Sequence, residues 1–162
     1  MTKAMIASLS CTLFATIIGT AYAQQTYENT NCRAGTMTVL AQADDMIVYA
    51  LDHRGVNISA EPGNPFGDSA QRCIGVVAVI GGKAAGNGWC RNVDPKTGDW
   101  YVVDWKTSDK PGTGTYTFRY GTGKWKGVTG DGTYELLAPT KPVDAGTYQN
   151  CARIRGTVKV PG

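Results

Sequence analysis

Three aspartates lie close together in the sequence and could serve as cation ligands or as an acid–base pair: Asp94, Asp99 and Asp104. Asp94 and Asp99 flank a Pro-Lys-Thr-Gly turn, where an aspartate side chain ordinarily hydrogen-bonds to the nearby backbone. Their spacing does not match that of an EF-hand calcium loop. Asp104 shares a strand face with Trp100. If that face points inward, Asp104 is a buried carboxylate with a raised pKa and a candidate site residue, whereas an outward face, which we favour, leaves it solvated.

His53 is the only histidine, and it lies beside Asp52 in a strand-like segment. Neighbours in a strand point to opposite faces of the sheet, so these two residues cannot form a local acid–base pair. We therefore expect a packed or surface histidine. Glu135 could face an interior together with Thr133 or lie outside. With no G-x-S-x-G nucleophile motif present, the sequence predicts no catalytic residue, no metal site and no cofactor.

Four cysteines follow residue 23, and an even number in an exported protein indicates two disulfides. If Gly81-Gly82 is a two-residue hairpin turn, Ile80 faces Lys83 and, counting outward, Cys73 faces Cys90. That position is a non-hydrogen-bonded pair, whose Cα atoms lie about 4.5 Å apart, a separation that a disulfide tolerates. A wider turn would change this register. Cys32 and Cys151 remain, and their pairing requires the first and last strands to be neighbours.

The first 23 residues have the order of a secretory signal peptide. Lys3 supplies the positive charge, an uncharged run extends from Ala4 to Gly19, and Ala21-Tyr22-Ala23 is a small-x-small cleavage site. A membrane anchor would need roughly 20 strongly apolar residues, and hydroxyl residues interrupt this run. Cys11 lacks the sequence context of a lipidation site. We predict a bacterial Sec substrate that is cleaved after Ala23 and is periplasmic or secreted, with no membrane span thereafter.

Composition excludes further classes of function. The whole chain carries a formal net charge of +3, and its basic residues are scattered. A nucleic-acid groove needs clustered Lys and Arg, so no nucleic-acid partner is expected. Residues 24–162 have the length of one domain.

Strand-like segments with turn signals between them recur along this domain, and no helical period appears. They number about eight, which favours an antiparallel closed barrel, with a β-sandwich as the alternative. The segments are Thr36–Ala41, Met46–Ser59 with a bulge or bend expected at Gly55, Cys73–Ile80, Asn87–Val93, Trp100–Trp105, Thr113–Tyr120, Asp131–Leu137 and Thr147–Val158.

The run from Tyr116 to Tyr134, with Gly121, Gly123, Gly127 and Trp125, is the most distinctive stretch. It resembles the glycine-rich segment of the allene oxide cyclase/dirigent-like β-barrel proteins, especially small exported bacterial members. The hairpin at residues 88–99 is also similar to one in those bacterial proteins. The resemblance covers the C-terminal half and implies an eight-stranded barrel of the calycin-like type around a partly apolar interior. The catalytic constellation of the plant enzymes is not traceable, so no catalytic residue is carried over.

Aromatic residues offer the better functional hypothesis, because a barrel of eight strands can hold one small ligand. The expected ligand-binding residues are Trp100, Asp104, Tyr116, Phe118, Tyr120 and Glu135. The alternative is that the aromatic residues only form the barrel core. The sequence thus favours a non-enzymatic barrel that binds a small apolar ligand or a protein partner. The alternatives are an isomerase or cyclase of a lipid-like substrate, by family analogy, and a structural or interaction module of the cell envelope.

Overall fold

The computed structural model describes residues 24–59, 61, 64, 66–137 and 141–161, and the predicted signal peptide, residues 1–23, lies outside them. In this part of the chain a single 3-10 turn, η1 (Gly123–Trp125), crosses one end of the domain. The strands are β1 (Gln25–Ala43), β2 (Met46–Ile58), β3 (Ser69–Ile80), β4 (Lys83–Val93), β5 (Trp100–Thr107), β6 (Thr113–Gly121), β7 (Thr129–Leu136) and β8 (Thr147–Lys159).

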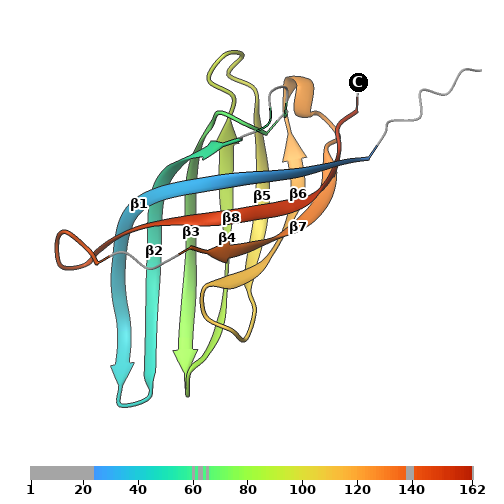
Figure 1. Ribbon diagram of the computed structural model, residues 1–162. Coiled ribbons are helices and arrows are strands. Elements are labelled where there is room, and N and C mark those ends of the chain that lie inside the picture. Colours follow the sequence, from blue (N-terminus) through green and yellow to red (C-terminus); the bar gives the residue numbers. More distant parts are fainter. Residues whose placement is uncertain (1–23, 60, 62–63, 65, 138–140, 162) are drawn as a thin grey trace, which may run out of the picture.

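These strands form an eight-stranded antiparallel closed barrel, as the sequence predicted, and not a sandwich (Figure 1). Each strand pairs with its neighbours in the chain, and β1 closes the barrel by pairing with β8 from Gln25↔Val158 to Thr36↔Thr147. Because the sheet is closed, none of the eight strands is an edge strand. No helix in the described part of the chain has the length and apolar character needed to cross a membrane.

Two details of the predicted strands are wrong. The first strand begins at Gln25 rather than at Thr36, because its N-terminal half carries polar residues on both faces and gives no amphipathic signal. Gly55 is not a bulge, because the pairing of β2 with β1 and its pairing with β3 both continue through Gly55 without a change of register. The irregularity on this side lies in β1, between Val39 and Ala41. Gly55 is needed instead for close packing, because a Cβ atom there would lie 2.8 Å from the Cβ of Arg33.

Alternate residues of every strand point into the barrel, and glycines in the wall make room for the largest of them. A Cβ atom on Gly75 or Gly88 would lie within 2.5 Å of the Trp105 ring. Gly132 gives the same room to Tyr116, whose hydroxyl hydrogen-bonds to that of Tyr27. Large aromatic rings from β5 and β6 therefore lie directly against glycine residues on neighbouring strands.

Both predicted disulfides are present, in the predicted pairing. Cys73 faces Cys90 across the β3–β4 hairpin, with Cα atoms 4.0 Å apart. Cys32 faces Cys151 across the β1–β8 closure, also at 4.0 Å. The first bridge lies inside the barrel, where both cysteines are buried, whereas the second lies on the outer wall.

Candidate functional site

A cavity of about 290 Å³ occupies the lumen of the barrel. Inward-facing residues from all eight strands line it. Its wall is largely apolar and aromatic, with Val77, Val79, Trp105, Phe118 and Tyr134 among the lining side chains. Ligand pockets typically measure about 300–1,000 Å³, so this cavity is of the size that takes a compact ligand.

Aromatic side chains close one end of the lumen. Phe66 comes from the connection between β2 and β3 and Trp125 from η1, and each is only 1% exposed. Their ring centroids lie 4.8 Å apart. Tyr101 packs against both rings, and Tyr27 packs against Phe66. Trp125 belongs to the glycine-rich run, and Gly121 lies against it, since a Cβ atom on Gly121 would be 2.5 Å from the Cβ of Trp125.

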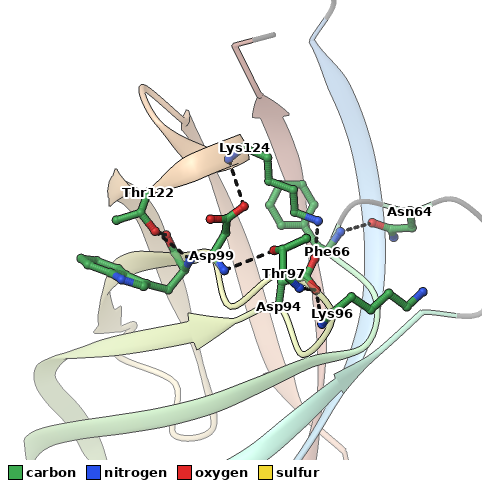
Figure 2. Close-up of polar contacts among 9 residues, drawn as sticks. Asn64, Phe66, Asp94, Lys96, Thr97, Asp99, Thr122 and Lys124 are labelled. Atoms are coloured by element: carbon green, nitrogen blue, oxygen red, sulfur yellow. Dashed lines mark hydrogen bonds and ion pairs between the residues drawn. The ribbon is translucent and has the colours of Figure 1, made fainter.

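Polar contacts outside these rings hold the closed end in place (Figure 2). The backbone N–H of Phe66 donates to Oδ1 of Asn64. Lys124, next to Trp125, forms an ion pair with Asp94. Asp94 also accepts hydrogen bonds from two backbone N–H groups of its own turn, as its sequence context predicted. The ion pair thus joins η1 to the turn between β4 and β5, and the hydrogen bond to Asn64 stabilises the loop that carries Phe66.

The opposite end of the lumen is its mouth. There the lining residues are half-buried rather than buried: Met37, Tyr49, Leu51, Val79 and Leu136. They lie toward the end that carries the β3–β4 turn and the β5–β6 loop, whose Pro111 and Gly112 also line the cavity. A ligand would therefore enter from this end.

Five buried polar side chains form a hydrogen-bonded layer beneath the aromatic cluster. Asn31 donates to Asn57 at 2.9 Å, and Asn57 donates to Ser69 and Asn92, each at 2.9 Å. Gln71 donates to Asn92 at 3.0 Å. In the described structure Oδ1 of Asn31 and Oε1 of Gln71 have no hydrogen-bond partner. Both residues line the cavity, so this polar layer forms part of its wall below the aromatic cluster.

Arg33 brings a positive charge into the lumen. Its Nε donates to Oδ1 of Asn150 at 2.8 Å, and burial lowers the pKa of its guanidinium. None of the ion pairs among the described residues involves Arg33. Burial, opposed by the Arg33 charge, raises the pKa of Tyr134 and Tyr148 to about 12. Both phenols therefore stay neutral and do not balance the cation.

His53 is 3% exposed and lies beside this cation. Its Nδ1 shares a hydrogen bond of 2.5 Å with the hydroxyl of Tyr148, which reaches it across Gly35 of the intervening strand. Burial, and then the Arg33 charge, lowers the pKa of His53 to about 3. Asp52 points outward and pairs with Arg72 at 2.8 Å, so the predicted separation of Asp52 from His53 holds.

The internal disulfide lies next to His53. One ring nitrogen of His53 and the sulfurs of Cys73 and Cys90 lie within 4.8 Å of one another, a grouping that could hold a metal ion. In this structure the two sulfurs are bonded to each other. They therefore offer no thiolate, which is the form of cysteine that binds metals.

The structure divides the predicted ligand-binding residues into two sets. Tyr116 and Phe118 line the lumen. Trp100, Asp104, Tyr120 and Glu135 lie on the outer wall, so they cannot contact a ligand in the lumen. There Asp104 pairs with Arg119 at 2.7 Å and Glu135 with Lys110 at 3.9 Å.

Tyr120 lies outside because β6 contains a bulge. Val102 pairs with Tyr120 and Val103 with Phe118, which leaves Arg119 as an extra residue. The bulge moves Tyr120 to the face opposite to Phe118, where its ring packs on that of Trp100 at 5.5 Å. The alternation of Tyr116, Phe118 and Tyr120 in the sequence thus predicted the wrong face for the last of them.

Sequence reasoning missed Arg33 and His53 as lumen residues. The available signal was the alternation of side chains along β1. Because Arg33 follows Cys32, it must face the side opposite to the Cys32–Cys151 bridge. That signal gives the two faces but does not say which of them is the interior.

No protein-family model matches this sequence, and no curated protein matches it either. Solved structures of dirigent proteins are similar to it in fold. The pterocarpan synthase dirigent protein GePTS1 superposes with a TM-score of 0.52 at 10% identity, covering 94% of this chain and 100% of its own. The pterocarpan synthase dirigent protein PsPTS1 has a TM-score of 0.52 at 11% identity, covering 86% and 97%. The chain therefore has the barrel fold of dirigent proteins, in agreement with the resemblance in its glycine-rich segment.

Proposed function

We propose that this protein is an exported, disulfide-stabilised barrel that binds a small, largely apolar molecule in its lumen without transforming it. The observation that carries the proposal is the cavity itself. It measures about 290 Å³, is walled mainly by apolar and aromatic side chains, and is closed at one end by Phe66 and Trp125. A concave, mostly apolar site with a few convergent polar groups is the usual form of a ligand pocket.

Export is the second part of the proposal. Two disulfides indicate an oxidising location, either extracellular or periplasmic. The signal-peptide pattern of residues 1–23 supports the same conclusion, and we propose cleavage after Ala23 by a bacterial signal peptidase.

The non-enzymatic role is supported by the chemistry of the lumen. The described carboxylates that form ion pairs do so on the outer wall or the loops, not inside the cavity. His53 is a weak base at neutral pH because its pKa is about 3, and efficient general bases have a pKa near the working pH. The dirigent neighbours are named as pterocarpan synthases, but a shared fold does not transfer an activity. An isomerase or cyclase is therefore the weaker proposal.

A protein partner is the second candidate, favoured by apolar side chains on the outer wall. Ile74 and Trp89 face each other across β3 and β4 and are 52% and 51% exposed. Val76, on the same face of β3, is 43% exposed. Exposed apolar patches of this kind often mark interaction sites.

One pair of variants tests whether a small molecule binds in the lumen or on the outer wall. Val79→Trp places a large ring at the mouth of the lumen, and Val76→Trp makes the same change on the outer face of the same strand. We expect Val79→Trp to weaken binding of the neutral fluorescent probe N-phenyl-1-naphthylamine at least tenfold, and Val76→Trp to leave it unchanged. If only Val76→Trp weakens binding, the probe binds on the outer wall and the lumen proposal fails.

A further inference from the structure

The charges of this barrel are distributed unevenly between its lumen and its outer wall. Outside, Asp52, Asp104 and Glu28 each form an ion pair with an arginine. Inside, Arg33 donates to a neutral amide oxygen, and Tyr134 and Tyr148 remain protonated phenols. His53 is uncharged at neutral pH, since its pKa is about 3. The described lumen therefore holds an uncompensated positive charge.

Arg33 is half-buried in the lumen. A charge that is partly removed from water and has no ion-pair partner costs free energy, so such charges are normally paired or bound to a ligand. The hydrogen bond to Asn150 uses one of the five N–H donors of the Arg33 guanidinium. The neighbouring strand makes room for this side chain, because Gly55 on β2 has no Cβ atom, and one there would lie 2.8 Å from the Cβ of Arg33. Gly55 on β2 thus leaves room for the large side chain of Arg33. None of the ion pairs among the described residues balances its charge.

We propose that the ligand of the lumen is a compact organic anion, a monocarboxylate with an apolar body, whose carboxylate pairs with Arg33. This inference rests on the proposed function, because it names the class of ligand that the same cavity takes. A guanidinium matches the geometry of a carboxylate through two parallel N–H···O bonds, and such charge-assisted bonds are the strongest in proteins.

The rest of the cavity fits the other end of such a molecule. Val77, Val79 and Trp105 provide an apolar wall in the same lumen, and burial of this kind favours an aromatic or short aliphatic body. The volume of about 290 Å³ limits the body to a compact group. A dianion is disfavoured, because the described lumen offers one cation.

The test compares acids with their neutral amides, which have the same shape. Isothermal titration calorimetry with the purified, oxidised protein would measure the dissociation constants of 2-naphthoic acid and 2-naphthamide at pH 7. Octanoic acid and octanamide provide a second pair with an aliphatic body. We expect at least one acid to bind about tenfold or more tightly than its amide, because only the acid forms the charge-assisted bonds with Arg33.

Variants assign this preference to one residue. Arg33→Met keeps the length of the side chain and removes its charge, and it is expected to abolish the preference for the acid while leaving binding of the amide intact. Arg54→Met is the matched control, since it removes the same charge from an exposed residue of β2, and it should preserve the preference. Arg33→Lys should retain part of it. Far-UV circular dichroism establishes that each variant is folded.

The outcomes separate the inference from the proposed function. If acid and amide bind the unmodified protein equally well, the lumen binds ligands but the charge inference is wrong. The charge inference is equally wrong if Arg54→Met removes the preference as fully as Arg33→Met does. If none of the four compounds binds, the charge inference is wrong, and the proposed function fails as well if N-phenyl-1-naphthylamine does not bind either. Should Arg33→Met fail to fold, the unmodified protein and Arg33→Lys still test the inference.

Discussion

At the scale of single residues, the lumen keeps its one histidine neutral. His53 is buried against Tyr148 and lies close to the Arg33 charge, and both burial and that charge disfavour a second positive charge. The imidazole therefore accepts or donates a hydrogen bond as a neutral group in the folded protein. In the unfolded chain it regains an ordinary pKa near 6.5.

This difference predicts a pH dependence of stability. Between about pH 6.5 and pH 3 the unfolded chain binds a proton at His53 that the folded protein does not. Unfolding is therefore favoured as the pH falls through this window, with a slope that approaches about 1.4 kcal/mol per pH unit. Above pH 6.5 the contribution is constant. Urea unfolding from pH 4.5 to pH 7 should show this slope, and His53→Gln should flatten it.

The comparison between the unmodified protein and His53→Gln separates the contribution of His53 from that of the other titrating groups. Asp52 and Asp94 have lowered pKa values because of their partners Arg72 and Lys124, so they lose stabilising interactions only at lower pH. They do so equally in both proteins. Parallel stability curves between pH 4.5 and pH 6.5 would mean that His53 titrates normally and that the lumen is wetter than its burial indicates.

At the scale of elements, the corner after β6 depends on glycine. Gly127 has a φ of +79°, a conformation that side chains with a Cβ atom rarely adopt, and a Cβ atom there would lie 3.0 Å from the ring of Pro161. This corner carries Trp125, which helps to close the lumen. A substitution here should therefore strain the backbone and loosen the closed end together.

We predict that Gly127→Val lowers the free energy of unfolding by about 1–3 kcal/mol, the usual cost of a strained backbone position. The control is Lys96→Val, which adds the same side chain at an exposed turn position without a positive φ, and it should change stability by no more than about 0.5 kcal/mol. The measurement is urea unfolding followed by tryptophan fluorescence. Equal effects of the two substitutions would show that the corner tolerates a Cβ atom.

The same elements show how far the sequence predicts the fold. Alternation and turn residues located most strands, and the Gly81-Gly82 turn fixed the β3–β4 register well enough to pair Cys73 with Cys90. Two things escaped prediction for physical reasons. A bulge at Arg119 reverses the face of Tyr120 without any change in composition. The first half of β1 buries polar Asn29 and Asn31, so its inward face does not look apolar.

The candidate site was harder to predict than the fold. Tyr116 and Phe118 were expected in the lumen because aromatic residues seek burial. Arg33 was not, since a charged side chain in a polar stretch is usually solvated. Its place next to Cys32 puts the two side chains on opposite faces of β1, but which face is the interior is decided only when the barrel closes through pairing between β1 and β8. The pairing of β1 with β8 joins residues from the two ends of the domain, so a short stretch of sequence does not indicate it.

At the scale of the whole molecule, the two disulfides constrain different parts of the fold. Cys73 and Cys90 are 17 residues apart and join the two strands of the β3–β4 hairpin inside the lumen. Cys32 and Cys151 are 119 residues apart and join the first strand to the last on the outer wall. The second bridge thus holds together the one strand pair that chain connectivity does not.

Loop length predicts how much each bridge stabilises the barrel. In the chain-entropy description a loop of about 15 residues contributes about 3 kcal/mol and one of about 100 residues about 4.7 kcal/mol. Replacing Cys32 and Cys151 together by alanine should therefore lower the free energy of unfolding by about 1–2 kcal/mol more than replacing Cys73 and Cys90, as measured by urea unfolding of the two double variants. Cys73 and Cys90 are buried, so replacing them also removes packing contacts in the lumen. This additional loss of stability makes the difference between the two double variants smaller. A larger loss from the inner pair would mean that packing of the lumen, rather than closure of the barrel, limits the stability of this protein.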